Sequence, residues 1–557
     1  MVAFIHGFTV VPQGENSGKW RKKMNKFMTR LLAVILILAM AITGCSAPAE
    51  PEETNNGTGE SETVAPENTT GDDEAVSSKD TLTVGLDREP GSLDPGDSTP
   101  SWMIHYNVYS RLITYDDDNV IQPDLAESWE QTDDVTWVFH LRQGVKFHNG
   151  EELKASDVVF SFDRLYDMPS ASSAMTEIVR ESIAAPDDYT FTFQTKRPYA
   201  FIESQLASNQ NPLYILNRKA VESVEQNVYS HAPVGTGPYK FESWTEGDSI
   251  VLTRNDDYFG EPAKLKTIVL RIINESSSRT IDLESGGIDL ATQVSANDID
   301  RLKENENTDV YTSTGSTIRC IAFNCEDELF KDVKVRKAFN HATDVATVRD
   351  ICYPASAPAV SPVAPNLLGR NTDLVQYEYD PAKAKELLAE AGYPNGVEVS
   401  FIYLANSTNN MLMELLQQMW GEAGITLKLE PTESATLSSM LNNGQYQMAS
   451  VNTGTNTLDG GEQMYTLFHS SNIGDSYSRC RLSDPAVAEI LDKIMTTTDT
   501  EERGALTYKA QEMVHELAPM IYIAHVYGVT GISSDLRGYN SNVSNMFRYS
   551  DFYFVEK

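Results

Sequence analysis

Cys45 is the residue whose surroundings most clearly predict a chemical step. It follows Ile-Thr-Gly at positions 42–44, an order that resembles a lipobox, in which the Cys thiol is diacylated and the Cys becomes the new N-terminus. The apolar run before it, residues 31–42, follows basic residues and is too short to span a hydrocarbon layer of ~30 Å. We therefore predict that residues 1–44 are a secretion signal and that the mature chain works outside the cytoplasm on a lipid anchor.

The segments on either side of this motif extend the prediction. Met24 would give the signal a compact basic start, so we expect translation to begin there. After the lipidated Cys45, the segment to residue 80 is rich in Glu, Asp, Thr, Asn, Gly, Ser and Pro and nearly lacks large apolar side chains. Such a composition cannot offset its chain entropy by burial, so we expect residues 45–80 to be a disordered acidic linker. An acidic interaction tail is the alternative.

The other cysteines lack the spacing of a metal site. Cys320, Cys325, Cys352 and Cys480 include no Cys-x-x-Cys pair and have no His at ligand spacing. Free Cys is usually buried, so we predict buried thiols. A disulfide of Cys320 or Cys325 with Cys352 is the alternative in an extracytoplasmic chain.

Common catalytic motifs are absent from the sequence. It holds no Gly-x-Ser-x-Gly and no His-Glu-x-x-His. Gly235 and Gly237 lack the Gly-Lys-[Ser/Thr] of a phosphate loop, so we expect them to permit a tight turn. Asp116, Asp117 and Asp118 lack the spacing of a calcium loop. We predict no enzyme, no cofactor and no metal; paired carboxylates, which are recognised by geometry, are the open enzymatic alternative.

The net charge is −36 over 557 residues. A chain this acidic is repelled by phosphates, which argues against nucleic acid or an anionic membrane surface as a partner. The part of the chain beyond residue 80 is long enough for two large domains.

Beyond residue 80, short β-rich runs alternate with amphipathic helical stretches. The patterns predict strands at 81–86, 136–141, 249–254, 397–403 and 425–430, and helices at 156–165, 333–352, 410–423 and 500–516. Asp380-Pro381 opens a further helix that Gly392 closes. The order helix, strand, helix, strand over 380–430 implies a crossover connection, and the hairpin-like turns of the first half suggest an α+β lobe before this α/β lobe.

Residues 126–162 carry an ordered series of motifs: Glu-x-Trp, aromatic-x-Phe-x-Leu-Arg, Val-Lys-Phe-His and Ala-x-Asp-Val. Pro-Val-Gly-Thr-Gly-Pro-Tyr follows at 233–239 and Asp-Val-Lys-Val-Arg-Lys-Ala-Phe-Asn at 332–340. This series resembles the signature of extracellular solute-binding protein family 5, which holds the peptide- and nickel-binding proteins of ABC importers. The resemblance covers residues 81 to about 557.

This resemblance implies an α/β, two-lobed periplasmic-binding-protein-like fold (type II, class C-like), with the solute buried between lobes that crossing strands join. Lobe I would comprise residues 81–310 with 535–557, including an extra subdomain near 115–230. Lobe II would span 311–534.

The resemblance also implies how a peptide would bind. In peptide-binding members, the peptide pairs with backbone groups of the cleft as an added strand, and an acidic side chain neutralises its α-amino group. In the matching segment of this chain, residues 450–464, the acid's position falls on Asn456 and the aromatic's on Thr453. A buried ammonium without a carboxylate is costly, so either Asp459 takes this role or the solute lacks a free amine.

Two more cleft walls follow from the resemblance: the loop 98–102, and the strand 316–320 with Arg319 as a carboxylate partner. The predicted ligand-binding residues are Thr99, Ser101, Trp102, Gln293, Arg319, Thr453, Asn456 and Asp459. Trp102, Tyr106 and Tyr109 are alternatives for stacking on a ring or sugar, unless Tyr109 packs inward.

The implied function is that of a non-catalytic, monomeric binding lipoprotein. It would hold an oligopeptide or dipeptide and deliver it to the permease of an ABC importer from the extracytoplasmic face of the cell membrane. A binding protein for an oligosaccharide or a metal chelate is the alternative. A signalling receptor or chaperone-like module with the same cleft is a third class, which the sequence does not separate from import.

Overall fold

The computed structural model describes residues 75–97, 101–168, 173–365, 367–455, 457–474, 477–539 and 546–556. The predictions for the signal segment, Cys45, the linker before residue 75, Thr99 and Asn456 lie outside these residues. The described residues belong to one compact unit, Asp73–Lys557.

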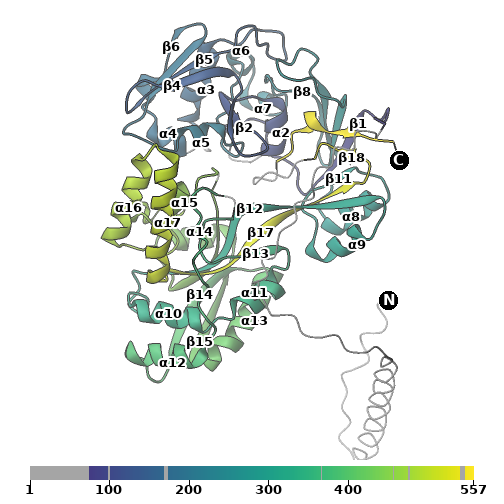
Figure 1. Cartoon of the computed structure of the whole chain (residues 1–557). Helices are drawn as coiled ribbons and strands as arrows, with labels where there is room; N and C mark the ends of the chain where they lie inside the picture. Colours follow the sequence, from purple (N-terminus) through teal and green to yellow (C-terminus); the bar gives the residue numbers. More distant parts are fainter. Residues whose placement is uncertain are drawn as a thin grey trace, which may run out of the picture. The chain divides into compact units, whose positions relative to one another are not determined.

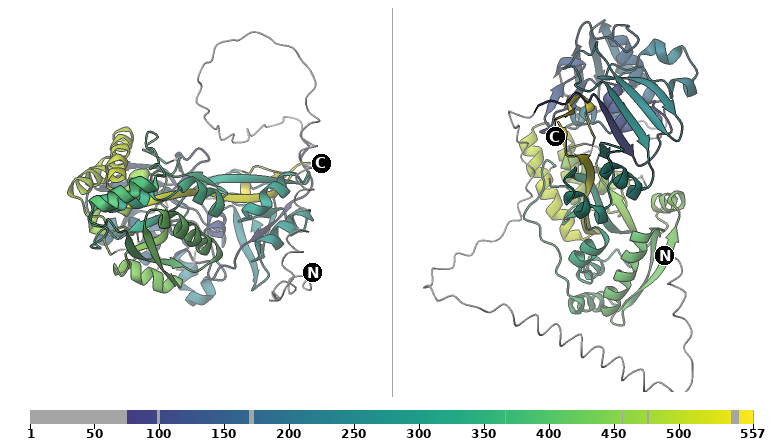
Figure 2. Two further views of the ribbon diagram at one scale, coloured as in Figure 1. Left: turned by 90° about the horizontal axis from the view of Figure 1, so that it is seen from below. Right: turned by 90° about the vertical axis from the view of Figure 1, so that its right-hand side faces the viewer.

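A mixed sheet of 11 strands runs through this unit. Its order is β15 (Ile425–Thr432), β14 (Val397–Leu404), β16 (Met448–Thr453), β12 (Thr308–Phe323), β17 (Met520–Ser533), β11 (Leu290–Ala291), β1 (Thr81–Leu86), β10 (Thr267–Ile272), β9 (Ser249–Arg254) and β8 (Tyr239–Thr245), and β13 (Ser356–Pro358) also pairs with β17. The antiparallel strands β12 and β17 cross from one half of the molecule to the other (Figures 1 and 2). The predicted two-lobed α/β fold is confirmed, whereas the exact lobe limits stay a prediction.

The first lobe combines one end of this sheet with a smaller antiparallel sheet. The small sheet has the order β4 (Ala126–Gln131), β5 (Thr136–Leu141), β7 (Thr190–Gln194) and β6 (Ala184–Asp187), and the hairpin β2 (Ile113–Tyr115) and β3 (Ile121–Pro123) lies nearby in sequence. Phe139 and Phe191 are buried in this sheet, and the ring of Phe191 packs against Phe139 and against Phe162 of α3. The helices are α2 (Trp102–Val108), α3 (Ala155–Leu165), α4 (Ser173–Glu177), α5 (Ile202–Ala207), α6 (Arg218–Glu222), α7 (Gln226–Tyr229), α8 (Ser276–Glu284) and α9 (Ile299–Lys303).

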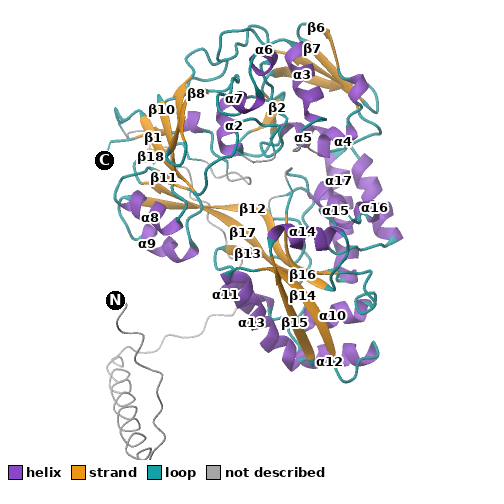
Figure 3. Ribbon diagram, turned by 180° about the vertical axis from the view of Figure 1, so that it is seen from behind, coloured by secondary structure: helices purple, strands orange, loops and turns teal. Residues whose placement is uncertain are grey.

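The second lobe is built on the other end of the large sheet. Its helices are α10 (Val333–His341), α11 (Val345–Cys352), α12 (Pro381–Glu390), α13 (Ser407–Glu422), α14 (Ser434–Asn442), α15 (Gly460–Phe468), α16 (Pro485–Thr496) and α17 (Thr500–Leu517). Strands β14 and β15 are parallel with α13 as their crossover, as the sequence predicts. Helices flank both strands (Figure 3), and Trp420 of α13 is fully buried against Phe401 of β14.

The single helix predicted at 333–352 is wrong, because the structure has two helices there. Asp344 lies between α10 and α11, and its carboxylate accepts hydrogen bonds from the backbone N–H of Thr347 (3.1 Å) and from its hydroxyl. An Asp with this pairing is an N-cap, and its non-helical backbone (φ −76°, ψ 86°) starts a new helix instead of continuing the old one.

Gly235 and Gly237, which the sequence predicts to permit a tight turn, allow a close approach of two backbone segments. Neither has a positive φ. A Cβ atom on Gly235 would lie 2.0 Å from the carbonyl oxygen of Val108, and one on Gly237 would lie 2.5 Å from that of Asn107. The segment therefore packs directly against the end of α2, the helix that begins with Trp102.

The variant Gly235→Ala is expected to lower the free energy of unfolding by about 1–3 kcal/mol, because the added methyl meets a backbone oxygen that no rotamer change can move. Chemical denaturation measures this loss. Gly421→Ala is the matched control, since a Cβ atom at this position of α13 would meet no neighbouring segment within 4 Å, and there Ala is expected to stabilise by about 0.5–1 kcal/mol. Equal effects at both positions would contradict the close-packing explanation.

Candidate ligand-binding cleft

A pocket of about 630 Å³ lies where β12 and β17 cross between the lobes. We call it the cleft pocket; it is lined by Trp102, Gln210, Gln293, Gly315, Ser316, Thr317, Arg319, Asn452, Thr453, Gly454, Thr455, Tyr477, Arg479, Val526, Tyr527 and Gly528. The structure thus brings together four predicted residues, Trp102 and Gln293 from the first lobe with Arg319 and Thr453 from β12 and β16. Their ligand-binding role stays a prediction.

The strands explain how this wall forms. β12 and β16 pair antiparallel with Arg319 opposite Asn452 and Ile318 opposite Thr453. The register between β12 and β17 shifts between Thr314 and Ile318, as at a β-bulge, which interrupts the ladder. The interruption falls on residues 315–317, which line the pocket, so this stretch of backbone is the part of β12 best suited to pair with an extended ligand.

Arg319 is the charged side chain that β12 contributes to this wall. It is half-buried, its Nε has no hydrogen-bond partner, and within the described part of the chain it forms no ion pair. Its guanidinium carbon lies 5.9 Å from the centre of the Tyr353 ring. Burial lowers the pKa of Arg319, with smaller opposing effects from Tyr353 and Cys320. An unpaired guanidinium in a concave wall is an electrostatic site for an anion.

The other described candidates lie elsewhere. Ser101 is buried before α2 and its hydroxyl donates to the carbonyl of Ser92 at 2.6 Å. Asp459 does not line the cleft pocket: its carboxylate accepts from the N–H of Gly461 at 2.8 Å and from Nε of Arg503 at 2.9 Å, and both charged side chains are buried. An acid held in this way would have to abandon Arg503 to neutralise an amine. Tyr109 packs inward, at 2% exposure.

Several lining residues were missed by sequence reasoning. Asn452 enters the pocket because it is the ladder partner of Arg319, a register that only the paired strands reveal. Gln210, Tyr477, Arg479 and Tyr527 come from three separate segments, and no local pattern marks any of them.

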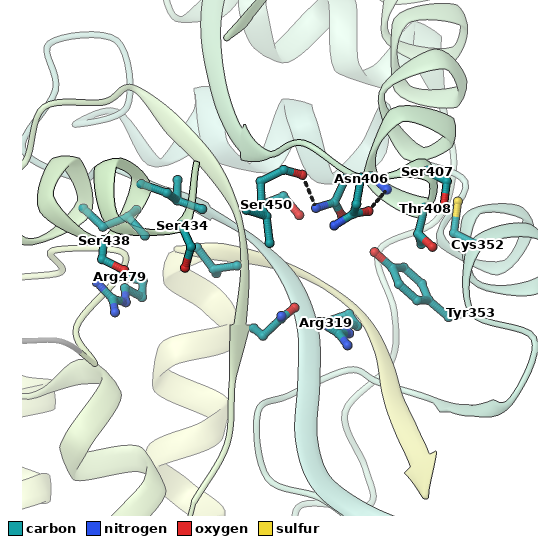
Figure 4. Close-up of a pocket in the computed structure, with 16 residues that line it drawn as sticks. Arg319, Cys352, Tyr353, Asn406, Ser407, Thr408, Ser434, Ser438, Ser450 and Arg479 are labelled. Atoms are coloured by element: carbon teal, nitrogen blue, oxygen red, sulfur yellow. Dashed lines mark hydrogen bonds between the residues drawn. The ribbon is translucent and has the colours of Figure 1, made fainter. Parts of the chain in front are cut away.

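A second pocket has a volume of about 450 Å³ and shares lining residues with the first. Figure 4 shows this second pocket in close-up. We call it the side pocket. Its lining is Arg319, Cys352, Tyr353, Leu404, Asn406, Ser407, Thr408, Asn409, Ser434, Leu437, Ser438, Leu441, Ser450, Val451, Asn452 and Arg479. Arg319, Asn452 and Arg479 line both pockets, so the two are continuous at these residues.

Glu462 is a buried carboxyl that contacts a residue of the cleft wall. Glu462 of α15 accepts hydrogen bonds from the hydroxyl of Thr455 at 3.1 Å, from the hydroxyl of Thr457 and from the amide of Gln205. Burial raises the pKa of Glu462 to about 7, although the two threonine hydroxyls oppose the shift. Thr455 also lines the cleft pocket, which connects this carboxyl to the cleft wall.

Glu462 should make the protein less stable as the pH rises from about 4.5 to about 7. In this window the Glu462 carboxyl has lost its proton in the unfolded chain but keeps it in the folded chain. This difference lowers the free energy of unfolding by up to ~3 kcal/mol as the pH rises. Glu462→Gln removes this term, and its free energy of unfolding relative to the wild type is therefore expected to be higher at pH 8 than at pH 4. Denaturation across this range measures the difference; Glu414→Gln, on the exposed face of α13, should follow the wild-type curve, and parallel curves for Glu462→Gln would contradict the prediction.

The cysteines of the described residues are free thiols. Cys320, Cys352 and Cys480 are buried and Cys325 is half-buried, in agreement with the predicted burial for the first three. In the described part of the chain no three His, Cys, Asp or Glu residues are grouped so that they could hold a metal ion. No helix in these same residues combines the length and apolarity of a membrane span.

Known proteins with similar sequences and structures are solute-binding proteins. The family model for bacterial extracellular solute-binding proteins, family 5 Middle, matches residues 120–475. The Haemophilus influenzae protein named heme-binding protein A is 30% identical over 476 residues, which cover 80% of this chain and 86% of that protein. The Escherichia coli dipeptide-binding protein is 27% identical, with 78% of this chain and 86% of that protein covered.

Two solved structures illustrate the similarity of the fold. The Helicobacter pylori periplasmic binding protein DppA, associated with an ABC transporter and in complex with the peptide STSA, has a TM-score of 0.73 and 31% identity and covers 86% of this chain and 98% of its own. HbpA2 from Haemophilus parasuis has a TM-score of 0.78 and 25% identity, with 85% and 99% covered.

Proposed function

The chain belongs to the bacterial extracellular solute-binding proteins of family 5, and on this premise we propose that it captures a peptide between its lobes for an ABC importer. One observation carries the proposal: a pocket at the crossing of β12 and β17 that takes its lining from both lobes. Closure of two lobes over such a pocket would bury the solute and give the permease a changed surface to recognise.

The polar lining supports a peptide as the solute. The interrupted stretch of β12 offers backbone groups for strand-like pairing, which holds peptides of differing side chains. The Escherichia coli relative is named for dipeptides, and the Helicobacter pylori structure holds a peptide. No step of bond making or breaking is needed for this function, so the proposed role is non-catalytic.

The remaining parts of the proposal rest on the sequence. A thiol at Cys45 that is diacylated would anchor the protein on the extracytoplasmic face of the cell membrane, and the acidic linker would hold the folded unit away from it. The proposed partners are the transmembrane subunits of the importer, with the binding protein acting as a monomer. Electrospray mass measurement of the full chain extracted from membranes tests the anchor, since Cys45→Ser should release the protein without the acyl mass.

Native mass spectrometry of the purified full chain tests the solute. The protein is sprayed intact to detect bound mass and is then denatured to identify what is released. Short peptides of mixed sequence support peptide capture. A released oligosaccharide or metal chelate would overturn the peptide assignment while leaving a binding protein, and a cleft that stays empty after addition of a tripeptide mixture would count against it as well.

A further inference from the structure

A buried polar contact joins the first lobe to the second where helix α5 meets helix α15. Gln205 of α5 donates a hydrogen bond from its amide nitrogen to the carboxyl of Glu462 on α15. The two residues are 1% and 9% exposed, and Figures 1 and 3 show α5 beside α15 and α17. The contact lies outside the connecting strands β12 and β17, so a movement of one lobe against the other would break it.

The first lobe fixes the amide of Gln205 before it meets the carboxyl. The side-chain nitrogen of Asn211, which is also buried, donates to the backbone carbonyl of Gln205 at 2.9 Å and to its Oε1 at 2.7 Å. With Oε1 already accepting a hydrogen bond from Asn211, the group that Gln205 presents to the second lobe is its N–H donor. The orientation of this amide therefore does not depend on Glu462.

Apolar side chains from both lobes enclose this contact. The N–H of Ala200, just before α5, donates to the carbonyl of Met495 on α16 at 2.8 Å. The first-lobe and second-lobe members of one hydrophobic cluster meet here, and they include Phe201, Ile202, Leu206, Met464, Leu467 and Met495. Together the lobes keep the carboxyl away from water, which disfavours its charged form. Parting of the lobes would bring water to it.

The titratable and charged groups around Glu462 supply no counter-charge to it. Asp459 on the same helix raises its pKa further, and Arg503 of α17 is paired with Asp459. From the first lobe come Tyr115 of β2 and Tyr199, and burial raises the pKa of both phenols, so both stay neutral. Among the described residues Glu462 forms no ion pair. Its neutral, protonated form is therefore favoured while the lobes are together.

We propose that closure of the lobes over a solute takes up a proton, which Glu462 binds as its carboxyl is enclosed. This rests on the proposed capture of a solute between the lobes. In the open protein, water solvates the carboxylate and its pKa returns toward the ordinary value of about 4.5, whereas in the closed protein the pKa is about 7. Between these values only the closed protein holds the proton, so solute affinity falls as the pH rises.

Isothermal titration of the full chain with the peptide Ala-Ala-Ala, in pairs of buffers that differ in ionisation enthalpy, counts the protons taken up. The wild type is expected to take up close to one proton at pH 6 and nearly none at pH 8, with affinity about tenfold or more weaker at pH 8. Glu462→Gln is expected to lose this uptake and this pH dependence. The amino group of the peptide contributes equally in both proteins, so equal uptake by the two overturns the proposal.

Two further variants assign the proton to this carboxyl. Thr457→Val removes a hydroxyl that favours the charged form of Glu462, so its proton uptake should extend to higher pH than that of the wild type. Glu414→Gln, on the exposed face of α13, should keep the wild-type profile. General damage to the structure weakens binding at every pH but does not move the profile upward. An unmoved profile in Thr457→Val overturns the assignment to Glu462.

Failure of this inference and failure of the proposed function give different results. Binding of Ala-Ala-Ala without proton uptake overturns the inference and leaves peptide capture intact. If Ala-Ala-Ala does not bind, the result counts against peptide capture, and small-angle X-ray scattering of the empty full chain decides the proton link. A smaller radius of gyration at pH 5.5 than at pH 8 in the wild type, absent in Glu462→Gln, supports it; an equal response in both proteins, or none in the wild type, overturns it.

Discussion

Replacing Arg503 with Met is expected to lower the free energy of unfolding by about 3–5 kcal/mol, since it leaves the carboxylate of Asp459 buried without its counter-charge. The two side chains are buried, with Nε of Arg503 and Oδ2 of Asp459 2.9 Å apart. Arg503 also donates to the carbonyls of Thr497 and Thr498, each at 3.0 Å. Urea denaturation of the variant and wild type, followed by far-UV circular dichroism, measures the loss.

Two further variants give this prediction its controls. Lys493→Met breaks the exposed pair with Glu489 on α16, whose side chains are 60% and 71% accessible, and should cost only about 0.2–1 kcal/mol. Asp459→Asn in combination with Arg503→Met removes the orphaned charge while keeping an N-cap side chain for α15, so it should recover part of the loss. A cost for Arg503→Met no larger than that for Lys493→Met would refute the buried-pair argument.

The buried pair of Asp459 and Arg503 also bears on how the α-amino group of a peptide could be bound. The sequence alternatives were an Asp459 that turns toward the ligand or a solute without a free amine. Asp459 caps α15 and accepts a hydrogen bond from Arg503. Moving its carboxylate toward a ligand would therefore break the buried ion pair and leave Arg503 without its counter-charge. The described lining of the cleft offers carbonyls, hydroxyls and amides for an amine, but no carboxylate.

Local pattern predicted the strands well where side-chain alternation and turn residues agree. β1, β5 and β9 begin and end at the predicted residues because alternating apolar positions are bounded by polar or Gly-containing turns. The break between α10 and α11 was missed because Asp344 interrupts an otherwise continuous helical pattern, and its role depends on a side-chain hydrogen bond to Thr347.

The cleft was predictable in its walls but not in its chemistry. Resemblance to a family directed attention to Trp102, Gln293, Arg319 and Thr453, and the strands bring these residues into one pocket. The sequence does not show that Arg319 lacks a partner or that Asp459 has one 44 residues away. Both facts depend on contacts between segments distant in the chain, which a local sequence pattern does not reveal.

Replacing Arg319 with Met is expected to weaken solute binding without destabilising the empty protein. Truncating one partner of a buried charge pair costs about 2–5 kcal/mol of binding free energy, a loss of roughly 30-fold to several thousand-fold. Without solute, the variant should be as stable as the wild type or more stable, because the desolvated guanidinium has no acceptor to lose. Titration with Ala-Glu-Ala and thermal unfolding with and without it measure the two effects.

The contrast with Arg336 makes the test specific to an unpaired group. Arg336 is also buried, but its guanidinium donates to the carbonyls of Phe330, Lys331 and Leu517 at 2.6–3.1 Å. Arg336→Met should therefore destabilise the empty protein, because those carbonyls lose their donors. If Arg319→Met destabilised the empty protein to the same extent, Arg319 would be a structural residue whose partner is part of the chain. An unchanged or higher melting temperature, together with lost binding, is the result expected of a residue kept unpaired for its ligand.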